Sequence, residues 1–316
     1  MIKLDFFNDS GQTLLSGLCE YFHLNIDDAS SYFLSVNPDH LTPDKYVRDF
    51  MLNLSKSNSN EIEIVGQHMT TCSENDVFSF RETGVLDLKS MLQLKTPLSS
   101  FLLEYGIVVD VDNRVLILNN KEYPITNYGE ECVLCINDKT EKCTGYSRCD
   151  YRKCMDHLGL KLYKYGATVE FFINTSLERM SRYSSIRRHP EILVTLENVI
   201  KKAQKNHSPP YNLGYAWMRS KNKCCIVEFR AKLSDMETFA PIDWRAAYDD
   251  CDDCISFSGY TFSDYMQKSI PQTVFDNYRL LRLFFSIYYY DCEELGSLLS
   301  SKTVAPESIT RIIAVE

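Results

Sequence analysis

The spacing of apolar residues predicts helices at the start of the chain. Thr13–His23 carries Leu14, Leu15, Leu18 and Phe22 at intervals of three and four residues, which places them on one helical face. A second helix is expected over Thr42–Leu54, where a threonine precedes a proline at the first helical position. We therefore expect residues 1–57 to form a helical N-terminal region.

A different pattern, short runs rich in apolar and β-branched residues, predicts three strands. These runs cover Glu61–His68, Ala167–Ile173 and Lys223–Arg230, and the second lacks polar alternation, as expected for a strand that is buried on both faces. Strands this apolar are not left exposed, so we expect them to share one sheet system that lines a single cleft.

Helices are also expected between and after these strands. Ser73–Gly84 is predicted as a short helix that Ser73 caps and Gly84 ends, and a longer one is expected over Leu88–Tyr105. Glu191–Lys205 is amphipathic, and Asp276–Leu299 has the aromatic periodicity of a helical tail.

A short hairpin is predicted around Asn119-Asn120, between strands at Arg114–Leu118 and Glu122–Ile125. Together these elements predict an α+β protein with a mixed β core over residues 58–316 and a small zinc-binding insertion at 130–158.

Composition narrows the class of protein. The chain has 316 residues, 44% of them hydrophobic, which is typical of a globular protein with a sizeable core. It begins without the charged start and apolar run of a signal peptide, and it holds no apolar run of 18 residues. We expect a cytoplasmic protein that does not interact with membranes. The net charge of −9 disfavours a surface that follows nucleic-acid phosphates over the whole molecule.

The densest group of metal-binding side chains lies between Cys132 and His157. In a reducing compartment, clustered thiolates usually bind Zn²⁺ in a tetrahedron, and a sulfur-rich set is typical of a structural site. The preferred ligands form a C-x2-C pair followed by two more cysteines, namely Cys132, Cys135, Cys143 and Cys149. Cys154 or His157 in place of Cys143 is an alternative, and so are thiols that bind no metal. The pair Cys251 and Cys254 stands alone and gives a weaker signal.

The end of the first predicted strand carries the sequence His68-Met69-Thr70, followed by a polar helix that stops at Gly84. In this pattern the chain resembles the ADP-ribosyltransferase superfamily, and most of all its nucleic-acid-targeting toxin branch, over roughly residues 61–240. The resemblance implies an NAD-dependent transfer of ADP-ribose to a macromolecular acceptor, a nucleic acid or a protein, as in a bacterial toxin or a phage-defence effector.

The resemblance also implies roles for individual residues. His68 and Thr70 would hold the ribose and the nicotinamide amide of NAD, and Arg81 would approach the pyrophosphate. Glu228 in the third strand would be the catalytic carboxylate, acting with His68, because cleavage of the nicotinamide bond develops positive charge at the ribose. Tyr183 or Tyr211 would stack on the nicotinamide ring.

Two other classes of function remain open. One is a zinc-stabilised binding or sensor module that recognises a protein or a nucleic acid without catalysis. The other is a ribonuclease in which Arg187, Arg188 and His189 supply the phosphate contact and the base. The sequence lacks P-loop, zincin, serine-hydrolase and dinucleotide-fingerprint motifs.

Overall fold

The computed structural model describes residues 1–36, 43–73, 76–126, 149–165, 168–176, 186–203, 212–220, 222–238, 269–290, 294–299 and 302–315. It confirms the α+β class. The chain forms two compact units, each made of three chain segments. Unit 1 comprises Met1–Gln67, Glu170–Arg179 and Phe229–Leu299, and unit 2 comprises His68–Val169, Met180–Glu228 and Ser300–Glu316. The predicted division after residue 57 falls inside the first segment of unit 1 and stays a prediction.

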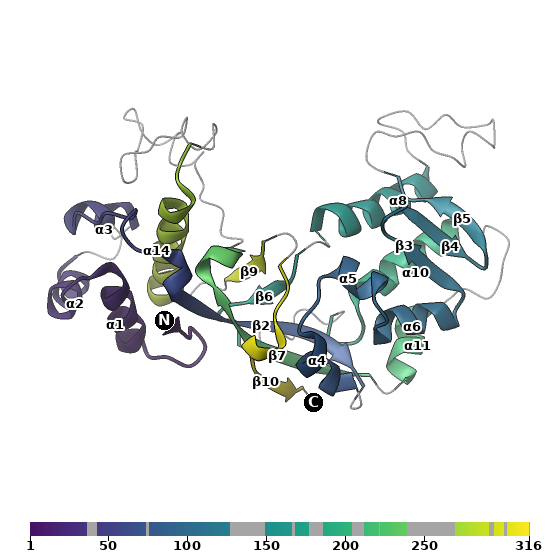
Figure 1. Ribbon diagram of the computed structural model, residues 1–316, viewed down its shortest axis with the longest axis horizontal. Coiled ribbons are helices and arrows are strands. Elements are labelled where there is room, and N and C mark those ends of the chain that lie inside the picture. The colour runs from purple at the N-terminus through teal and green to yellow at the C-terminus, as the bar shows by residue number, and fades with distance from the viewer. Residues whose placement is uncertain are drawn as a thin grey trace. The chain divides into compact units, whose positions relative to one another are not determined.

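Helices of unit 1 lie close together (Figure 1), and aromatic side chains pack between them. They are α1 (Gly11–Phe22), α2 (Ile26–Ser35), α3 (Pro43–Asp49) and α14 (Gln272–Tyr290). The ring of Phe33 on α2 stacks on Tyr46 of α3 at 5.4 Å, and Tyr46 meets Phe285 of α14 edge-on at 5.6 Å. The aromatic residues of the predicted tail helix are therefore core residues, since Phe284 and Phe285 are buried.

A buried polar network ties α14 to the chain that leads into the sheet. Asn277 donates to the carbonyl oxygens of Leu54 and Ser57, each at 2.7 Å, and its Oδ1 accepts a 2.6 Å bond from the Tyr21 hydroxyl of α1. Because these buried groups have hydrogen-bond partners, the network offsets the cost of their desolvation and fixes the position of α14.

The strands of the larger sheet pair in the order β10-β7-β2-β6-β9-β8, with β1 alongside β2. Unit 1 holds β1 (Ile2–Leu4), which runs parallel to β2, and the antiparallel strands β6 (Glu170–Phe172), β8 (Met236–Thr238) and β9 (Leu295–Leu298). Unit 2 holds β10 (Ile309–Ala314). β2 (Ile62–Cys72) and β7 (Lys223–Lys232) contribute residues to both units. The prediction that the three apolar runs share a sheet is confirmed, because they form β2, β6 and β7. The single cleft that they were expected to line stays a prediction.

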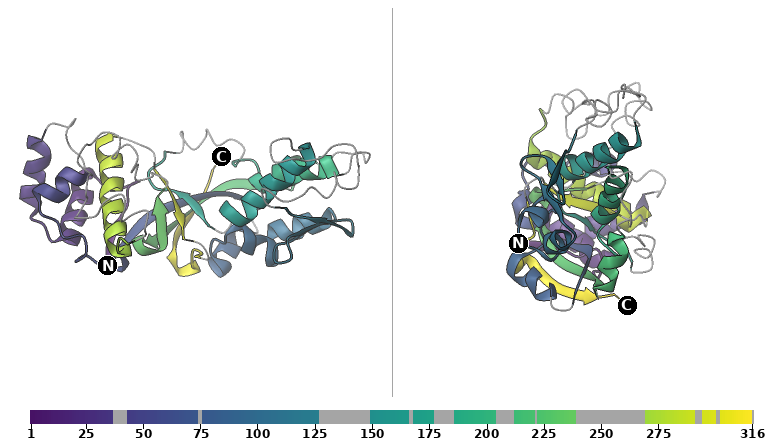
Figure 2. Two further views of the ribbon diagram at one scale, coloured as in Figure 1. Left: turned by 90° about the horizontal axis from the view of Figure 1, so that it is seen from above. Right: turned by 90° about the vertical axis from the view of Figure 1, so that its right-hand side faces the viewer.

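Unit 2 has its own hydrophobic core, which lies between a β meander and several helices. Figure 1 shows these elements. The meander consists of β3 (Ile107–Asp110), β4 (Val115–Leu118) and β5 (Lys121–Pro124). The helices around this core are α5 (Leu88–Gln93), α6 (Pro97–Glu104), α8 (Asp150–Leu160), α10 (Glu191–Ala203) and α11 (Leu213–Arg219). α4 (Ser79–Thr83) also belongs to unit 2, but none of its residues is buried. α8 and α10 pack side by side (Figure 2). The predicted hairpin is confirmed: Asn119 and Asn120 both have positive φ, as a two-residue turn of the type that matches strand twist requires.

The structure corrects two helix predictions. Leu88–Tyr105 is not one helix, because the chain leaves helical geometry at Leu94 and restarts at α6, where Thr96 caps the helix and Pro97 occupies its first turn. The tail helix ends at Tyr290, and the apolar residues after it form β9 instead.

The helix predicted from Ser73 also differs in detail. It consists of a 3₁₀ turn at Asp76–Phe78 that leads into α4, and Phe78 occupies the N-cap position without a side-chain capping bond. Gly84 ends α4 with a φ of 75°, as predicted. Among the described residues, no helix is both long and apolar enough to cross a membrane.

Candidate functional site

The His-x-Thr motif lies within β2, four residues before its end. His68 and Thr70 are partly exposed, whereas the intervening Met69 is buried. Successive side chains of a strand point to opposite faces, so His68 and Thr70 share one face of β2. The motif is thus placed where both side chains can contact one ligand, as the resemblance to ADP-ribosyltransferases requires.

Glu228 points to the other face of the sheet. The Sγ atoms of Cys72 in β2 and Cys225 in β7 lie 3.3 Å apart, so these two side chains share a face. By alternation His68 and Thr70 lie on the Cys72 face, whereas Glu228, an odd number of residues after Cys225, lies on the opposite one. The structure therefore does not bring the two residues predicted to act together, His68 and Glu228, into one pocket.

Contacts at other positions of the two strands agree with this assignment. In unit 1, a Cβ added to Gly66 would meet the side chains of Phe171 and Phe229. Gly66 and Phe229 therefore share one face, in agreement with the shared face of Cys72 and Cys225. In unit 2, Thr71 accepts a 2.9 Å bond from the indole N–H of Trp217, on the face away from Cys72. The strands thus keep a regular alternation around the motif.

The carboxylate of Glu228 is held by the neighbouring strand β10. Its Oε1 accepts a 2.8 Å bond from the Thr310 hydroxyl, and its Oε2 accepts a 2.8 Å bond from Nε of Arg311. A second guanidinium nitrogen of Arg311 lies 2.6 Å from the same Oε2. The Glu228 side chain is 8% exposed and that of Arg311 is 49% exposed, so a surface arginine neutralises a buried acid. This geometry is typical of a structural ion pair that fastens an edge strand.

The remaining residues proposed for NAD binding are only partly placed. Arg81 is exposed on α4, a helix that follows β2 after a short connection. Tyr183 and its alternative Tyr211 lie outside the described residues. Their roles stay predictions.

Most of the predicted zinc site also lies outside the described residues, because these include neither Cys132, Cys135 nor Cys143. Cys149 is described: it is the N-cap of α8, where its Sγ accepts a 3.4 Å bond from the Arg152 backbone N–H. Cys149 is therefore the one residue of the preferred set that the structure places, and its role as a Zn²⁺ ligand stays a prediction. Within the described part of the chain, no group of three or more His, Cys, Asp or Glu side chains is arranged to hold a metal ion.

The alternative ligands Cys154 and His157 both lie on α8. Burial raises the pKa of the Cys154 thiol, partly offset by the nearby charge of Lys202. His157 is exposed. The structure therefore does not decide between the preferred set and these two alternatives.

The Arg-Arg-His segment proposed for a ribonuclease makes structural contacts. The ring of His189 packs against α11, since a Cβ at Gly214 would come within 2.8 Å of it. Burial raises the pKa of the Cys224 thiol, and a hydrogen bond and the charge of Arg187 partly offset this rise. Arg187 and His189 are thus each in contact with a buried part of unit 2.

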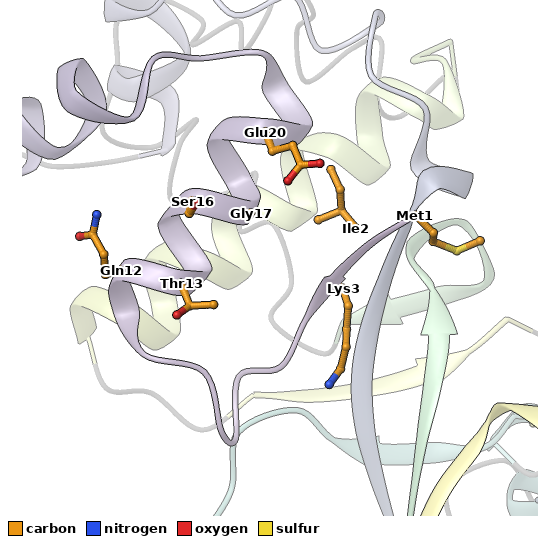
Figure 3. Close-up of a pocket in the computed structure, with 8 residues that line it drawn as sticks. All are labelled: Met1, Ile2, Lys3, Gln12, Thr13, Ser16, Gly17 and Glu20. Atoms are coloured by element: carbon orange, nitrogen blue, oxygen red, sulfur yellow. The ribbon is translucent and has the colours of Figure 1, made fainter.

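A cavity of about 530 Å³ lies between β1 and α1 in unit 1 (Figure 3). Figure 3 shows its lining residues, which come from the N-terminus, from β1 and from α1: Met1, Ile2, Lys3, Gln12, Thr13, Ser16, Gly17 and Glu20. None of the residues predicted from the sequence to bind NAD or zinc lines it. Its mixed polar wall lacks a convergent set of catalytic groups, and the amine of Lys3 is engaged with Asp5 at 3.2 Å.

Sequence reasoning missed two buried acids in unit 1. Glu294 accepts a short hydrogen bond from Ser286 of α14, and burial raises the pKa of its carboxyl group. Asp276 pairs with Arg279 at 2.6 Å, and both side chains are at least 95% buried. The signal in the sequence was weak, because these acids stand among aromatic residues or in an acidic run and match no motif.

Comparisons of the chain with protein-family models, curated proteins and solved structures found no match.

Proposed function

We propose that this protein is a non-catalytic binding module for a macromolecular partner, in which Glu228 has a structural role. The observation that carries the proposal is the position of Glu228. Its carboxylate faces away from His68 and Thr70, and Thr310 and Arg311 already engage both of its oxygens. A carboxylate that must stabilise charge on a bound ribose needs to face the ligand.

A protein partner is favoured over a nucleic acid. The net charge of −9 opposes close approach to phosphates, whereas several large apolar side chains of unit 2 are exposed. They include Phe78 at 68%, Leu103 on α6 at 63% and Tyr215 on α11 at 54%. Exposed apolar side chains support protein recognition more than they support contact with a charged backbone.

Affinity capture tests the binding module directly. The wild-type protein is compared with a Leu103→Glu, Tyr215→Ser variant under native conditions, with and without nuclease. We expect a protein that the wild type retains after nuclease treatment and that the variant loses. Equal capture by both proteins would exclude these two residues from the binding surface, and loss on nuclease treatment would indicate a nucleic-acid partner.

The transferase hypothesis from the sequence has a separate test with NAD. A ligand at 100 times its dissociation constant stabilises the folded state by about 2.7 kcal/mol, which a thermal-shift assay detects readily. We expect no shift with NAD and no release of nicotinamide. A saturable shift that His68→Ala removes, together with NAD cleavage that Glu228→Gln removes in a normally folded protein, would overturn the proposal in favour of ADP-ribosyl transfer.

A further inference from the structure

We propose that Cys72 and Cys225 form a reversible disulfide that joins β2 to β7. Their Sγ atoms are 3.3 Å apart, both side chains are more than 90% buried, and both residues belong to unit 2. The two residues are 153 positions apart in the chain, so this contact exists only because the strands meet on one face of the sheet. The inference does not depend on the proposed function.

The geometry is close to what the bond needs. A disulfide has an S–S distance of about 2.05 Å, so the sulfurs must approach by little more than 1 Å. Cys72 is the last residue of β2 and Cys225 lies within β7, so sheet pairing holds the chain on one side of Cys72 and on both sides of Cys225. Changes of the two side-chain torsions can supply the motion.

Hydrogen peroxide is an oxidant that completes the reaction. The thiolate of one cysteine attacks a peroxide oxygen and breaks the O–O bond, which gives a sulfenic acid and water after proton transfer. The second thiol then attacks the sulfenic sulfur, and its proton leaves with the displaced hydroxide as a second water. Two thiols and one peroxide thus give one disulfide and two waters, and an added dithiol reductant reverses the change.

The surroundings make this reaction slow but selective. The hydrogen bond with Cys72 and burial strongly raise the pKa of the Cys225 thiol, so little thiolate is present at neutral pH. Once either sulfur is oxidised, however, its partner lies in contact and reacts before a dissolved thiol or a second peroxide.

The bond would lie beside the sequence motif. Thr70 is two residues before Cys72 and shares its face of β2, and His68 lies two residues further back. Oxidation would therefore fix β2 against β7 next to these two partly exposed polar side chains, and it makes this face of the sheet sensitive to redox conditions.

Peptide mapping of the full chain tests the proposal. The reduced protein is exposed to hydrogen peroxide, blocked with an alkylating agent and digested with trypsin. We expect a linked pair of peptides, 57–81 joined to 224–230, with a mass two hydrogens below the sum of the reduced peptides. Dithiothreitol should separate them. A chain cross-linked over this separation should also melt at a temperature higher by about 5 °C or more.

Cys224 provides a matched control, because it lies in the same tryptic peptide but on the other face of β7. Cys224→Ser should keep the cross-link and the rise in melting temperature, whereas Cys225→Ser and Cys72→Ala should lose both. The proposal is overturned if other cysteines are oxidised while Cys72 and Cys225 are recovered separately alkylated. A cross-link that survives in Cys225→Ser and disappears in Cys224→Ser would overturn it as well.

Discussion

At the scale of single residues, Glu294 couples the stability of unit 1 to pH. Burial raises its pKa above the ordinary value of 4.5, and the Ser286 hydroxyl and the charge of Arg282 only partly oppose this rise. The protonated acid is therefore favoured in the folded state. Its stabilising contribution is complete below pH 4.5 and is lost as the pH rises through the folded-state pKa.

Glu294→Gln should remove this loss. We expect the variant to be more stable than the wild type at pH 7, and the difference should shrink as the pH is lowered toward 4.5. Urea unfolding at a series of pH values measures this difference in stability. The control is Glu237→Gln, which replaces an exposed acid of β8 in the same unit. A wild type whose stability rises with pH relative to the variant would contradict the assignment.

The pair of Glu228 and Arg311 makes a second prediction at this scale. Arg311→Ala should lower the free energy of unfolding by about 1–3 kcal/mol, because it leaves a buried carboxylate without its charged partner. The loss of stability should fall near the lower end of this range, since the Arg311 side chain is half exposed and water can replace part of its interaction with Glu228. Chemical denaturation of both single variants and of the double variant with Glu228→Gln should give coupling between the two sites. Additive effects would mean that the ion pair contributes nothing.

At the scale of elements, the start of α6 shows how a few residues divide one predicted helix into two. The Thr96 side chain accepts a bond from the Ser99 backbone N–H, and the Ser99 hydroxyl accepts one from the Thr96 N–H, which completes a capping box. The backbone before Pro97 avoids helical geometry. The break after α5 is therefore built into the sequence.

Thr96→Ala should destabilise the protein by about 1 kcal/mol, because it leaves an N–H group of the first turn without its acceptor. Thr96→Ser keeps the hydroxyl and should cost much less. Thermal unfolding of the two variants separates these outcomes, and equal losses would show that the methyl group of Thr96, rather than its capping bond, stabilises α6.

Prediction from sequence succeeded where local pattern determines structure. The apolar runs of β2, β6 and β7 and the turn at Asn119-Asn120 are recognisable because burial and positive φ select particular residue types. The break at Thr96 was also encoded locally but was outweighed by the apolar periodicity on either side. β10 was missed, because its Ile309–Ala314 segment pairs at an edge and is only partly buried.

The candidate site was harder to predict, because it depends on pairing between distant segments. The motif residues His68 and Thr70 could be placed on one side of a strand from alternation alone. The face on which Glu228 lies could not, because it is set by the contact of Cys72 with Cys225 and by the bonds to Thr310 and Arg311. The sequence around Glu228 does not indicate that Thr310 and Arg311 are its partners.

At the scale of the whole molecule, the predicted zinc site determines how much metal the purified protein should contain. Purified protein should contain about one Zn²⁺ per chain, and Cys149→Ser should lower both the zinc content and the melting temperature, since metal binding contributes to folding. Cys154→Ser should leave the zinc content unchanged if the preferred ligand set is correct. Elemental analysis decides between these sets, and protein that is prepared without chelator and lacks zinc would exclude both.

The division of each unit among three chain segments has a consequence for synthesis on the ribosome. Unit 1 begins with residue 1 but needs residues up to 299, so it cannot complete its core until residue 299 has been synthesised. At common rates of translation, the gap between the first segment and the last is on the order of 10 to 30 seconds. During that time the apolar strand β2 at first lacks both of its neighbours, β6 and β7, and after the synthesis of β6 it still lacks β7. An apolar strand without its neighbours is prone to aggregation, and slower translation would lengthen its exposure.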